Sequence, residues 1–365
     1  METKELFEIV SHFALEGRVT EITPLGEGFI NDTFTVRTAG NAPDYILQRK
    51  NRRIFPDVPA MMDNIVAVTN HIRRKVEAAG GDTSREVLTV ISTRDGLPYF
   101  IFGGEYWTMC LYIADSVTYD RADTPALAYK GGEGIGLFQS QLADFDRPLA
   151  ETITGFHNIS YRFGQWDSSI ARDAAGRCRS LAREIDWIES RRAEMTDFWS
   201  LVESGEIPMR VTHNDTKISN ILFDRKGGVL CVIDLDTVMS STSLNDFGDA
   251  IRTFANTGAE DDRNLANVSL DMAMFRAYTE GYLSQRKSTM SDSEKEWLAF
   301  GARYIVYEQV LRFLMDYIDG DTYYKTASPD HNLVRTHAQF ALLRSIEQHY
   351  DEMCGIVRQL TAENC

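Results

Sequence analysis

The first 113 residues carry mainly the alternation of apolar and polar positions that is typical of β-strands. An amphipathic run opens the chain, with Phe7, Val10 and Phe13 at helical spacing. One longer helical pattern occupies 61–81 and ends on Gly-Gly, a common helix stop. The segments 87–93 and 99–102 are expected to form a hairpin around the turn "RDGLP". The other predicted strands lie at 19–38, where two strands flank a glycine turn, and at 43–50 and 105–113.

Beyond residue 115 the pattern changes to long helical periodicity. Two short apolar runs, "NILFD" and "VLCVIDLDT", interrupt it between 210 and 240, and "RKGG" joins them, so we expect a small hairpin there. The predicted fold class is therefore α+β and two-lobed, with a strand-rich N-lobe and one main helix at 1–113 and a mainly helical C-lobe at 114–365. The expected helices of the C-lobe lie at 125–144, 169–203, 268–285, 292–318 and 332–361.

Composition supports a folded two-lobed chain and narrows the classes of partner. With 365 residues, 43% of them hydrophobic, the chain can bury a large core. No run of about 18 apolar residues occurs, so no transmembrane helix is expected. The formal net charge of −16 argues against nucleic acid or an anionic membrane as the main partner. Composition leaves open whether the chain is a monomer or a weak homo-oligomer.

The cysteines and the N-terminal segment indicate a cytoplasmic protein. Five cysteines occur without a CxxC pair, so free thiols in a reducing compartment are expected rather than a cysteine metal site. The N-terminal segment lacks the basic region and the small-residue cleavage site of a secretory signal. We therefore expect a cytoplasmic location.

The densest group of polar residues lies in "RVTHNDTKISNILFD", residues 210–224. A carboxylate held in a loop, such as Asp215, can orient a substrate hydroxyl and accept its proton. Asn220 and, after the next apolar run, Asp234 offer the oxygen ligands that Mg²⁺ prefers and usually shares with phosphates. A base and two metal ligands, spread over a loop and the following hairpin, are the layout of a phosphotransfer site. The alternative is that Asp215 and Asn220 only cap local turns.

Lys217 and a glycine turn add to the phosphotransfer hypothesis. Lys217 can place a positive charge on a phosphate as it transfers, or it can be an ordinary exposed lysine, whereas His213 is expected to hold the loop. Gly26 and Gly28, in "PLGEGFIND", stand between two predicted strands, where backbone N–H groups can approach the phosphates of ATP closely. The alternative for this turn is a simple hairpin.

The motif H-x-D-x-K-x-x-N in "HNDTKISN", together with "VIDLDT", resembles the catalytic and metal segments of protein-kinase-like small-molecule kinases. The aminoglycoside phosphotransferase and choline kinase families share this layout. More specifically, "SHFALEG", "GFINDTF", "YILQRKN", "DFGDAIR", "FRAYTEGY" and "HNLVRT" resemble the bacterial N-acetylhexosamine 1-kinases. These segments run from residue 11 to residue 336, over nearly the whole chain.

The resemblance implies a role for each catalytic motif. It implies Asp215 as the catalytic base, Lys217 beside the transferring phosphate, and Asn220 and Asp234 as ligands of Mg²⁺ on the ATP phosphates. Asp236 is a candidate for metal binding or for a supporting contact.

The literal string "DFG" at 246–248 follows the metal strand too late to be the kinase metal motif. We expect Asp246 to be the N-cap of a helix. The resemblance implies that Asp249 hydrogen-bonds the catalytic loop.

The same resemblance places the ATP contacts in the N-lobe. Aligned on the kinase V-A-I-K pattern, Gln48 stands where the phosphate-binding lysine is usual, so Arg49 or Lys50 is left to supply the charge. Strand alternation puts Lys50 on the face of Gln48 and Arg49 on the opposite face. The segment "CLYIADS" is the implied hinge, with adenine contacts expected near Tyr112 and Ile113.

The acceptor is expected to bind in the C-lobe. By resemblance, Arg312 and Tyr323 bind sugar oxygens, and Phe254 either packs on the apolar face of the sugar or belongs to the core. The alternative for the helix of Arg312 is a ladder of surface ion pairs. Its residues at i, i+4 spacing are Tyr304, Glu308, Arg312 and Asp316.

The sequence therefore predicts ATP- and Mg²⁺-dependent phosphorylation of the anomeric hydroxyl of an N-acetylhexosamine, of the GlcNAc or GalNAc type, with Asp215 as base. Kinases for choline, ethanolamine, homoserine or aminoglycosides are open alternatives. A non-catalytic nucleotide-binding module is a further alternative, which Gln48 alone favours. A protein kinase is disfavoured because no A-P-E segment follows the metal motif.

Overall fold

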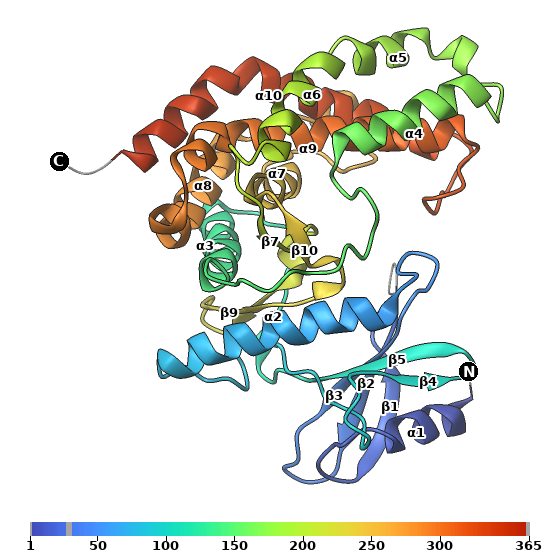
Figure 1. Ribbon diagram of the computed structural model, residues 1–365, viewed down its shortest axis with the longest axis vertical. Coiled ribbons are helices and arrows are strands. Elements are labelled where there is room, and N and C mark those ends of the chain that lie inside the picture. The colour runs from blue at the N-terminus through green and yellow to red at the C-terminus, as the bar shows by residue number, and fades with distance from the viewer. Residues whose placement is uncertain (1, 27–30, 363–365) are drawn as a thin grey trace. The chain divides into compact units, whose positions relative to one another are not determined.

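The computed structural model describes residues 2–26 and 31–362 (Figure 1). The chain divides into two compact units. Unit 1 consists of Met1–Thr118, Gln141–Thr154 and Asn220–Ser240, and unit 2 consists of Tyr119–Ser140, Gly155–Ser219 and Ser241–Cys365. Unit 1 thus gathers three separate stretches of chain, one of which carries both predicted metal ligands. The assignment of nucleotide binding to 1–113 and of catalysis to 114–365 stays a prediction.

Unit 1 is built on an antiparallel sheet, and the described strands follow the order β1-β2-β3-β5-β4. A smaller described sheet has the order β6-β8-β9. The bounds in unit 1 are α1 Thr3–Ser11, β1 Val19–Pro24, β2 Asp32–Thr38, β3 Tyr45–Arg49, α2 Val58–Ala78, β4 Phe100–Phe102, β5 Glu105–Leu111, β6 Ser116–Val117, β8 Ile221–Asp224 and β9 Val229–Val232.

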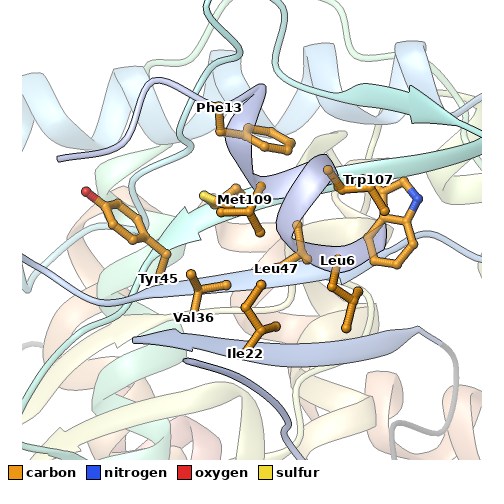
Figure 2. Close-up of a cluster of buried hydrophobic side chains, with 10 residues drawn as sticks. Leu6, Phe13, Ile22, Val36, Tyr45, Leu47, Trp107 and Met109 are labelled. Carbon is orange, nitrogen blue, oxygen red and sulfur yellow. The ribbon is translucent and has the colours of Figure 1, made fainter. Parts of the chain in front are cut away.

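Alternation along the strands gives the larger sheet two different faces. One face packs with α1 into an apolar core, and Figure 2 shows side chains from the N-terminal segment and from the strands meeting there. Leu47 and Trp107 are fully buried in it, and each such side chain contributes about 1.5–3 kcal/mol by leaving water. The opposite face presents Ile46, Gln48 and Thr108 to a pocket. In β3 and β5, odd-numbered residues such as Leu47 and Trp107 therefore belong to the core, whereas even-numbered residues such as Gln48 and Thr108 are available to a ligand.

The predicted hairpin of 87–93 with 99–102 is wrong. Within the described chain, 87–93 forms only isolated bridges, such as Val90 with Cys110, and β4 pairs instead with β5. The reason is the turn between β4 and β5, where Gly103 and Gly104 have φ of 60° and 81°. Two successive positive φ values make the tight turn that matches the twist of adjacent strands, so Phe100–Phe102 pairs with the strand that follows it.

Unit 2 is mainly helical, and Figure 1 shows α9 and α10 running side by side. The helices are α3 Pro125–Gln141, α4 Ile159–Arg172, α5 Ala182–Glu189, α6 Arg192–Glu203, α7 Ser243–Phe254, α8 Met272–Arg286, α9 Asp292–Ile318 and α10 His331–Thr361. Two short strands, β7 (Arg210–Thr212) and β10 (Met239–Ser241), flank the predicted catalytic region in sequence. Together with unit 1, these elements confirm the α+β class.

The predicted continuous helical pattern at 169–203 is broken into several helices. α4 ends where Asp173 takes a left-handed backbone conformation with φ of 41°, and Gly176 follows with φ of 66°. A left-handed residue ends a helix by turning the chain away from the helix axis. The carboxylate of Asp173 then accepts the N–H groups of Arg177 and Cys178, which holds the turn.

Helices α7 and α9 approach each other closely in unit 2 because glycines face each other. A Cβ on Gly248 would lie 2.1 Å from the carbonyl oxygen of Gly301, and a Cβ on Gly301 would lie 2.4 Å from that of Leu244. This contact fixes the position of α7. Among the helices that the structure describes, none combines the length and the apolar character needed to cross a lipid bilayer.

Candidate active site

A pocket of about 390 Å³ lies within unit 1 and is lined by both apolar and polar residues. This size and this mixture of surfaces are typical of small-molecule sites. Its polar lining includes Gln48, Lys50, Asn220, Asp234 and Asp236, together with the hydroxyl-bearing residues Thr33, Thr108, Ser116 and Thr118. Its apolar lining includes Leu25, Ile46, Met62, Ile65, Leu88, Ile113, Leu222 and Ile233. The structure thus brings residues of β3 together with residues some 170–190 positions later in the chain.

The hairpin β8–β9 brings the two predicted metal ligands to the same end of the pocket. Ile221 pairs with Val232, so Asn220 precedes one strand and Asp234 follows the other. The carbonyl oxygen of Asn220 accepts the N–H of Ile233 at 2.9 Å, which closes this end of the hairpin. Asp234 has a left-handed backbone with φ of 60°, a conformation that costs a non-glycine residue about 1–2 kcal/mol. Such local strain is frequent at functional positions.

The donor types at this end of the pocket fit Mg²⁺. Hard cations take carboxylate and amide oxygens and complete their coordination with phosphate or water. Asn220, Asp234 and Asp236 supply such oxygens in the pocket lining. Assignment of Asn220 and Asp234 as the ligands remains a prediction.

Lys50 is the cation that the structure places in the pocket. Its ammonium lies 2.7 Å and 2.9 Å from the two carboxylate oxygens of Asp236 and 2.7 Å from Oε1 of Gln48. Lys50 is only 3% exposed, so this is a buried ion pair. Arg49 points the other way, is partly exposed, and pairs with Asp32 outside the pocket lining. Of the two residues that the sequence left open for the phosphate charge, the structure therefore brings only Lys50 to Gln48.

The hinge residues also line the pocket. Tyr112 and Ile113 are both in contact with it. The N–H of Tyr112 donates to the carbonyl oxygen of Asp44 at 2.9 Å, whereas that of Leu111 donates in the other direction, to Thr89. Tyr112 therefore uses its backbone N–H to extend the pairing of β3 with β5.

The glycine turn is described only in part. Gly26 has a positive φ of 65°, and nothing lies within 4 Å of the place where its Cβ would stand. Glycine is suited to such a backbone position. Gly28, the second predicted glycine of the turn, lies outside the residues that the structure describes.

The predicted catalytic loop belongs to unit 2 and carries Asp215 with Lys217. The ammonium of Lys217 lies 2.9 Å and 3.0 Å from the two oxygens of the Asp215 carboxylate. Burial lowers the pKa of Lys217, but the charge of Asp215 and their hydrogen bond raise it, with a net upward shift. Lys217 therefore stays charged beside Asp215. His213 is fully buried, and its Nδ1 accepts the N–H of Asp215 at 3.2 Å, which confirms that it holds the loop.

Helix α7 supports the catalytic loop through two carboxylates. Asp246 is not the N-cap, which is Thr242; it lies in the first turn of α7 and accepts the N–H groups of His213 and Asn214 at 2.9 Å and 2.7 Å. The N-cap prediction is wrong because the helix starts three residues earlier, at Ser243. Asp249 accepts the N–H of Thr216 at 2.8 Å, so its predicted contact with the loop is confirmed.

Asp249 is held in its charged form. Burial raises its pKa, but the neighbouring charges, led by the guanidinium of Arg252, and a hydrogen bond from Arg252 together outweigh this effect, and the net pKa is lowered. Arg252 forms the ion pair with Asp249 at 2.9 Å. A charged carboxylate is the stronger acceptor for backbone N–H groups, so the loop is fixed by charge-assisted hydrogen bonds.

The predicted acceptor residues Arg312 and Tyr323 lie in one neighbourhood of unit 2. The guanidinium of Arg312 lies 5.3 Å above the ring of Phe156 and 5.8 Å above that of Tyr324. The ring of Tyr324 meets that of Tyr323 edge-on, with centroids 4.8 Å apart. Arg312 is 9% exposed, whereas Tyr323 is 58% exposed. Arginine and aromatic side chains of this kind are suited to binding polar ligands with an apolar face.

The loop of Tyr323 is anchored from α9 by Asp316. Its carboxylate accepts the backbone N–H groups of Thr322, Tyr323 and Tyr324 at 2.8–3.1 Å. The side chain of Asn332 donates to the same carboxylate at 2.8 Å. The exposed aromatic ring of Tyr323 is thus carried by a fixed backbone.

The residues that recur along α9 do not form a surface ion-pair ladder. Glu308 is fully buried and pairs with residues outside the helix, namely with Nδ1 of His157 at 2.5 Å and with Nε of Arg162 at 3.3 Å. Burial raises the pKa of Glu308, but the charges of His157, Arg312 and Arg162 lower it to about 2. Glu308 is therefore the carboxylate that balances the two buried arginines.

Phe254 does not join Arg312 and Tyr323. It is 3% exposed at the end of α7, and its ring packs on that of Tyr278 with centroids 4.9 Å apart. A Cβ on Gly131 of α3 would collide with this ring at 2.2 Å. The structure thus places Phe254 in the packed interior between α3 and α8.

Several residues of these sites carried no interpretable signal in the sequence. Asn31 binds Asp236 at 2.7 Å across 205 positions, and His157 binds Glu308 across 151 positions. Neither lies at a motif spacing from its partner. Only the position of Asn31, directly after the glycine turn, pointed to the site.

Comparison with known proteins identifies the family. The sequence profile of the phosphotransferase enzyme family matches residues 21–283. An aminoglycoside phosphotransferase from Alicyclobacillus acidocaldarius is similar in structure, with a TM-score of 0.59 and 12% identity over 97% of this chain and 96% of that chain. A spectinomycin phosphotransferase in complex with ADP and spectinomycin has a TM-score of 0.53 and 12% identity over 99% of this chain and 98% of that chain.

At such low identity, the structural similarity shows the fold, and the profile match over most of the chain shows the family. The protein-kinase-like fold class predicted from the sequence is confirmed. The chain belongs to the phosphotransferase enzyme family.

Proposed function

We propose that the protein transfers the γ-phosphoryl group of ATP to the anomeric hydroxyl of an N-acetylhexosamine. The observation that carries the proposal is the pocket of unit 1, which Lys50, Asn220 and Asp234 line together with apolar residues. A purine fits apolar walls, and a polyphosphate needs a cation and metal ligands. One structural relative holds ADP, which supports the same class of nucleotide for this chain.

We expect the adenine to be recognised at Ile113 rather than at Tyr112. The N–H groups of Tyr112 and Leu111 already donate to the carbonyl oxygens of Asp44 and Thr89. Alternation along a strand directs the backbone groups of Ile113 to the opposite side from those of Tyr112. Ile113 lines the pocket. This refines the sequence prediction, which named Tyr112 and Ile113.

The charge around Arg312 favours a neutral acceptor over a cationic one. Burial lowers the pKa of Arg162, and the nearby charge of Arg312 lowers it further, which means that the two guanidinium groups lie close enough to repel each other. Glu308 is the carboxylate that they share. A choline or an aminoglycoside carries its own positive charge, which the two guanidinium groups would repel, so this neighbourhood disfavours it. A neutral sugar is compatible with it.

In the proposed mechanism the C1 oxygen of the sugar forms a bond to the γ-phosphorus as the bond to the ADP oxygen breaks. Asp215 orients the hydroxyl and accepts its proton, and Lys217, which pairs with that carboxylate, can place a positive charge beside the transferring phosphate. Asn220 and Asp234 would hold Mg²⁺, which supplies neutralisation of the phosphate charge. Lys50 binds the phosphates of the donor. The products are the sugar 1-phosphate and ADP.

The free thiols support the cytoplasmic location that we propose. Among the described residues, Cys110, Cys178, Cys231 and Cys354 are all unpaired with each other. Free thiols are the usual state in a reducing compartment.

An acceptor panel tests the substrate directly. The protein is incubated with ATP and Mg²⁺ and with GlcNAc, GalNAc, glucose, glucosamine, choline, homoserine or an aminoglycoside, and ADP release is followed. We expect turnover on an N-acetylhexosamine and a phosphorus NMR signal with coupling to the anomeric proton. Turnover confined to amino alcohols or aminoglycosides would replace the sugar by a cationic acceptor. ADP binding without turnover on the whole panel would favour a non-catalytic module.

Asp215→Asn tests the proposed base. The amide cannot accept the proton, so we expect turnover to fall by about 10²–10⁴-fold while ADP binding, measured by calorimetry, stays unchanged. Asp63→Asn, at an exposed position on α2, is the matched control and should retain full turnover. Asp215→Asn turnover within tenfold of the unaltered protein would exclude Asp215 as the base.

A further inference from the structure

The partner of Lys50 is unusual for a protein-kinase-like fold. In protein kinases, the phosphate-binding lysine of the third strand is paired by a glutamate of the adjacent helix. Here the helix that lines the pocket is α2, and it presents Met62 and Ile65. The acidic residues of α2, Asp63 and Glu77, are exposed and do not line the pocket. The carboxylate on Lys50 comes instead from Asp236, two residues after the predicted metal ligand Asp234.

We propose that Asp236 is the positioning residue of Lys50 and takes the place of the helix glutamate. This contact ties the phosphate-binding lysine to residues 234–238, the metal segment, which begins with the predicted ligand Asp234. The inference rests on the proposed nucleotide site. It assigns to Asp236 a supporting contact rather than metal binding.

The geometry of the contact is suited to positioning. Both carboxylate oxygens of Asp236 lie within 2.9 Å of the Lys50 ammonium, and Gln48 lies 2.7 Å from it. An ammonium has three N–H donors. Because one carboxylate receives two of them, Lys50 can turn one N–H to a phosphate and still be held by the other oxygen. The pair is 3% and 7% exposed in its side chains, so water does not weaken it appreciably.

Asp236 is itself held in this orientation. Nδ2 of Asn31 donates to Oδ2 of Asp236 at 2.7 Å, and Oδ1 of Asn31 accepts the N–H of Asn51 at 3.1 Å. Asn31 therefore links the start of β2, the residue after Lys50 and the metal segment. A carboxylate with several fixed hydrogen bonds loses little further freedom when the ligand binds, which is the basis of preorganisation.

Helix α2 is attached to the backbone of the same segment by a side-chain amide, that of Asn64, rather than by a charged group. Nδ2 of Asn64 donates to the carbonyl oxygens of Val238 and Ala150 at 3.1 Å and 2.8 Å. The position of Lys50 thus depends on the segment 234–238, to which α2 is also bound. In this arrangement the lysine and the metal ligand Asp234 are set by one stretch of backbone.

A double-mutant cycle measured without metal tests the proposal. ADP binding in EDTA is measured by calorimetry for the unaltered protein, Lys50→Met, Asp236→Asn and the double variant. We expect each single variant to raise the Kd by about tenfold, because a charge-assisted hydrogen bond is lost or misplaced. The double variant should bind no more than about twofold more weakly than Lys50→Met alone, because Asp236 acts only through Lys50.

Control variants and a second readout separate the possible outcomes. Asp32→Asn removes the exposed pair with Arg49 and should leave ADP binding unchanged. Asn31→Ala should weaken binding in the same direction as Asp236→Asn, by a smaller factor. In thermal unfolding without ligand, the double variant should lose less Tm than the sum of the losses of the two single variants. The reason is that each single variant leaves one buried partner unpaired, whereas the double variant removes both.

Three results would overturn the proposal. Additive losses in ADP binding would mean that Asp236 acts independently of Lys50. A loss that appears only with Mg²⁺, or tighter ADP binding by Asp236→Asn in EDTA, would make Asp236 a metal ligand or a repelling anion instead. No ADP binding by the unaltered protein, with or without Mg²⁺, would remove the nucleotide site itself and the inference with it.

Discussion

At the residue scale, the buried carboxylate of Glu308 stabilises the positive charge of the predicted acceptor residue Arg312. Its carboxylate is fully buried, yet its pKa is lowered to about 2 because His157, Arg312 and Arg162 surround it. An isolated buried carboxylate would shift in the opposite direction. Glu308 thus holds side chains from α4 and α9 and from the loop before α4 in one cluster. The charge of Arg312, a predicted acceptor residue, is thereby balanced.

Glu308→Gln should strongly destabilise the protein at neutral pH. Removing one partner of a buried ion pair leaves the other charge uncompensated, which costs about 3–5 kcal/mol. Because the folded-state pKa of Glu308 is below its ordinary value of 4.5, its contribution is complete above about pH 4.5 and is lost as the pH falls toward 2. Urea unfolding at pH 7.5 and at pH 3.5 should therefore show a gap between the two proteins that narrows at the lower pH.

Glu194→Gln is the matched control for this experiment. Glu194 pairs with Arg303 at the surface and is 46% exposed, and such pairs contribute only about 0–1 kcal/mol. Its effect on the free energy of unfolding should be small at both pH values. A Glu308→Gln protein as stable as Glu194→Gln at pH 7.5 would contradict the role assigned to the buried cluster.

At the scale of elements, α7 connects the packing of unit 2 to the catalytic loop. Its two carboxylates, Asp246 and Asp249, hold the backbone N–H groups of that loop. Its position is set by the glycine contact with α9. A small displacement of α7 would therefore move the backbone on which Asp215 stands.

Gly248→Ala should weaken both stability and turnover. A new Cβ would stand 2.1 Å from the carbonyl oxygen of Gly301 in α9, so the helices must separate. Overpacking of this kind costs about 1–3 kcal/mol, and we expect turnover to fall as the loop shifts. Gly355→Ala, in α10, has nothing within 4 Å of the new Cβ and should be stabilising by about 0.5–1 kcal/mol through helix propensity. Thermal unfolding of both variants provides the comparison, and a Gly248→Ala protein with unchanged Tm would show that α7 and α9 tolerate separation.

Local patterns predicted the elements that depend on local chemistry. The pattern at 292–318 coincides with α9, because the capping box of Ser291 and Glu294 marks its start and the periodicity continues to its end. The hairpin β8–β9 was predicted from two apolar runs and a glycine turn. The predicted hairpin at 87–93 was wrong because the Gly103–Gly104 turn gave β4 a better partner.

In the candidate sites, too, local patterns predicted some contacts, whereas contacts between distant parts of the sequence could not be predicted. Alternation in β3 was sufficient to put Lys50 beside Gln48 and to direct Arg49 away. The partners of these residues could not be predicted, because Asp236 meets Lys50 across 186 positions and a single sequence carries no record of such contacts. The same holds for Glu308, whose partner His157 belongs to a loop without a recognisable motif.

At the scale of the whole molecule, the pocket is a product of chain topology. Every described residue that lines it belongs to unit 1, but these residues come from Met1–Thr118 and from Asn220–Ser240. The second stretch lies between two parts of unit 2 in the sequence. Ligand binding to the pocket should therefore link two stretches of chain that are separated by about a hundred residues of sequence.

Hydrogen exchange with and without ADP and Mg²⁺ tests this arrangement. A ligand at 100 times its Kd stabilises the bound state by about 2.7 kcal/mol, so amides that open only when the pocket opens should exchange about a hundredfold more slowly. We expect this protection in 46–50, in 108–113 and also in 220–236, because all three ranges contain lining residues. The core of α10 contributes none of the lining and serves as the internal reference. Protection of the first two ranges without 220–236 would exclude the β8–β9 hairpin from the nucleotide site, and the proposed metal ligands Asn220 and Asp234 with it.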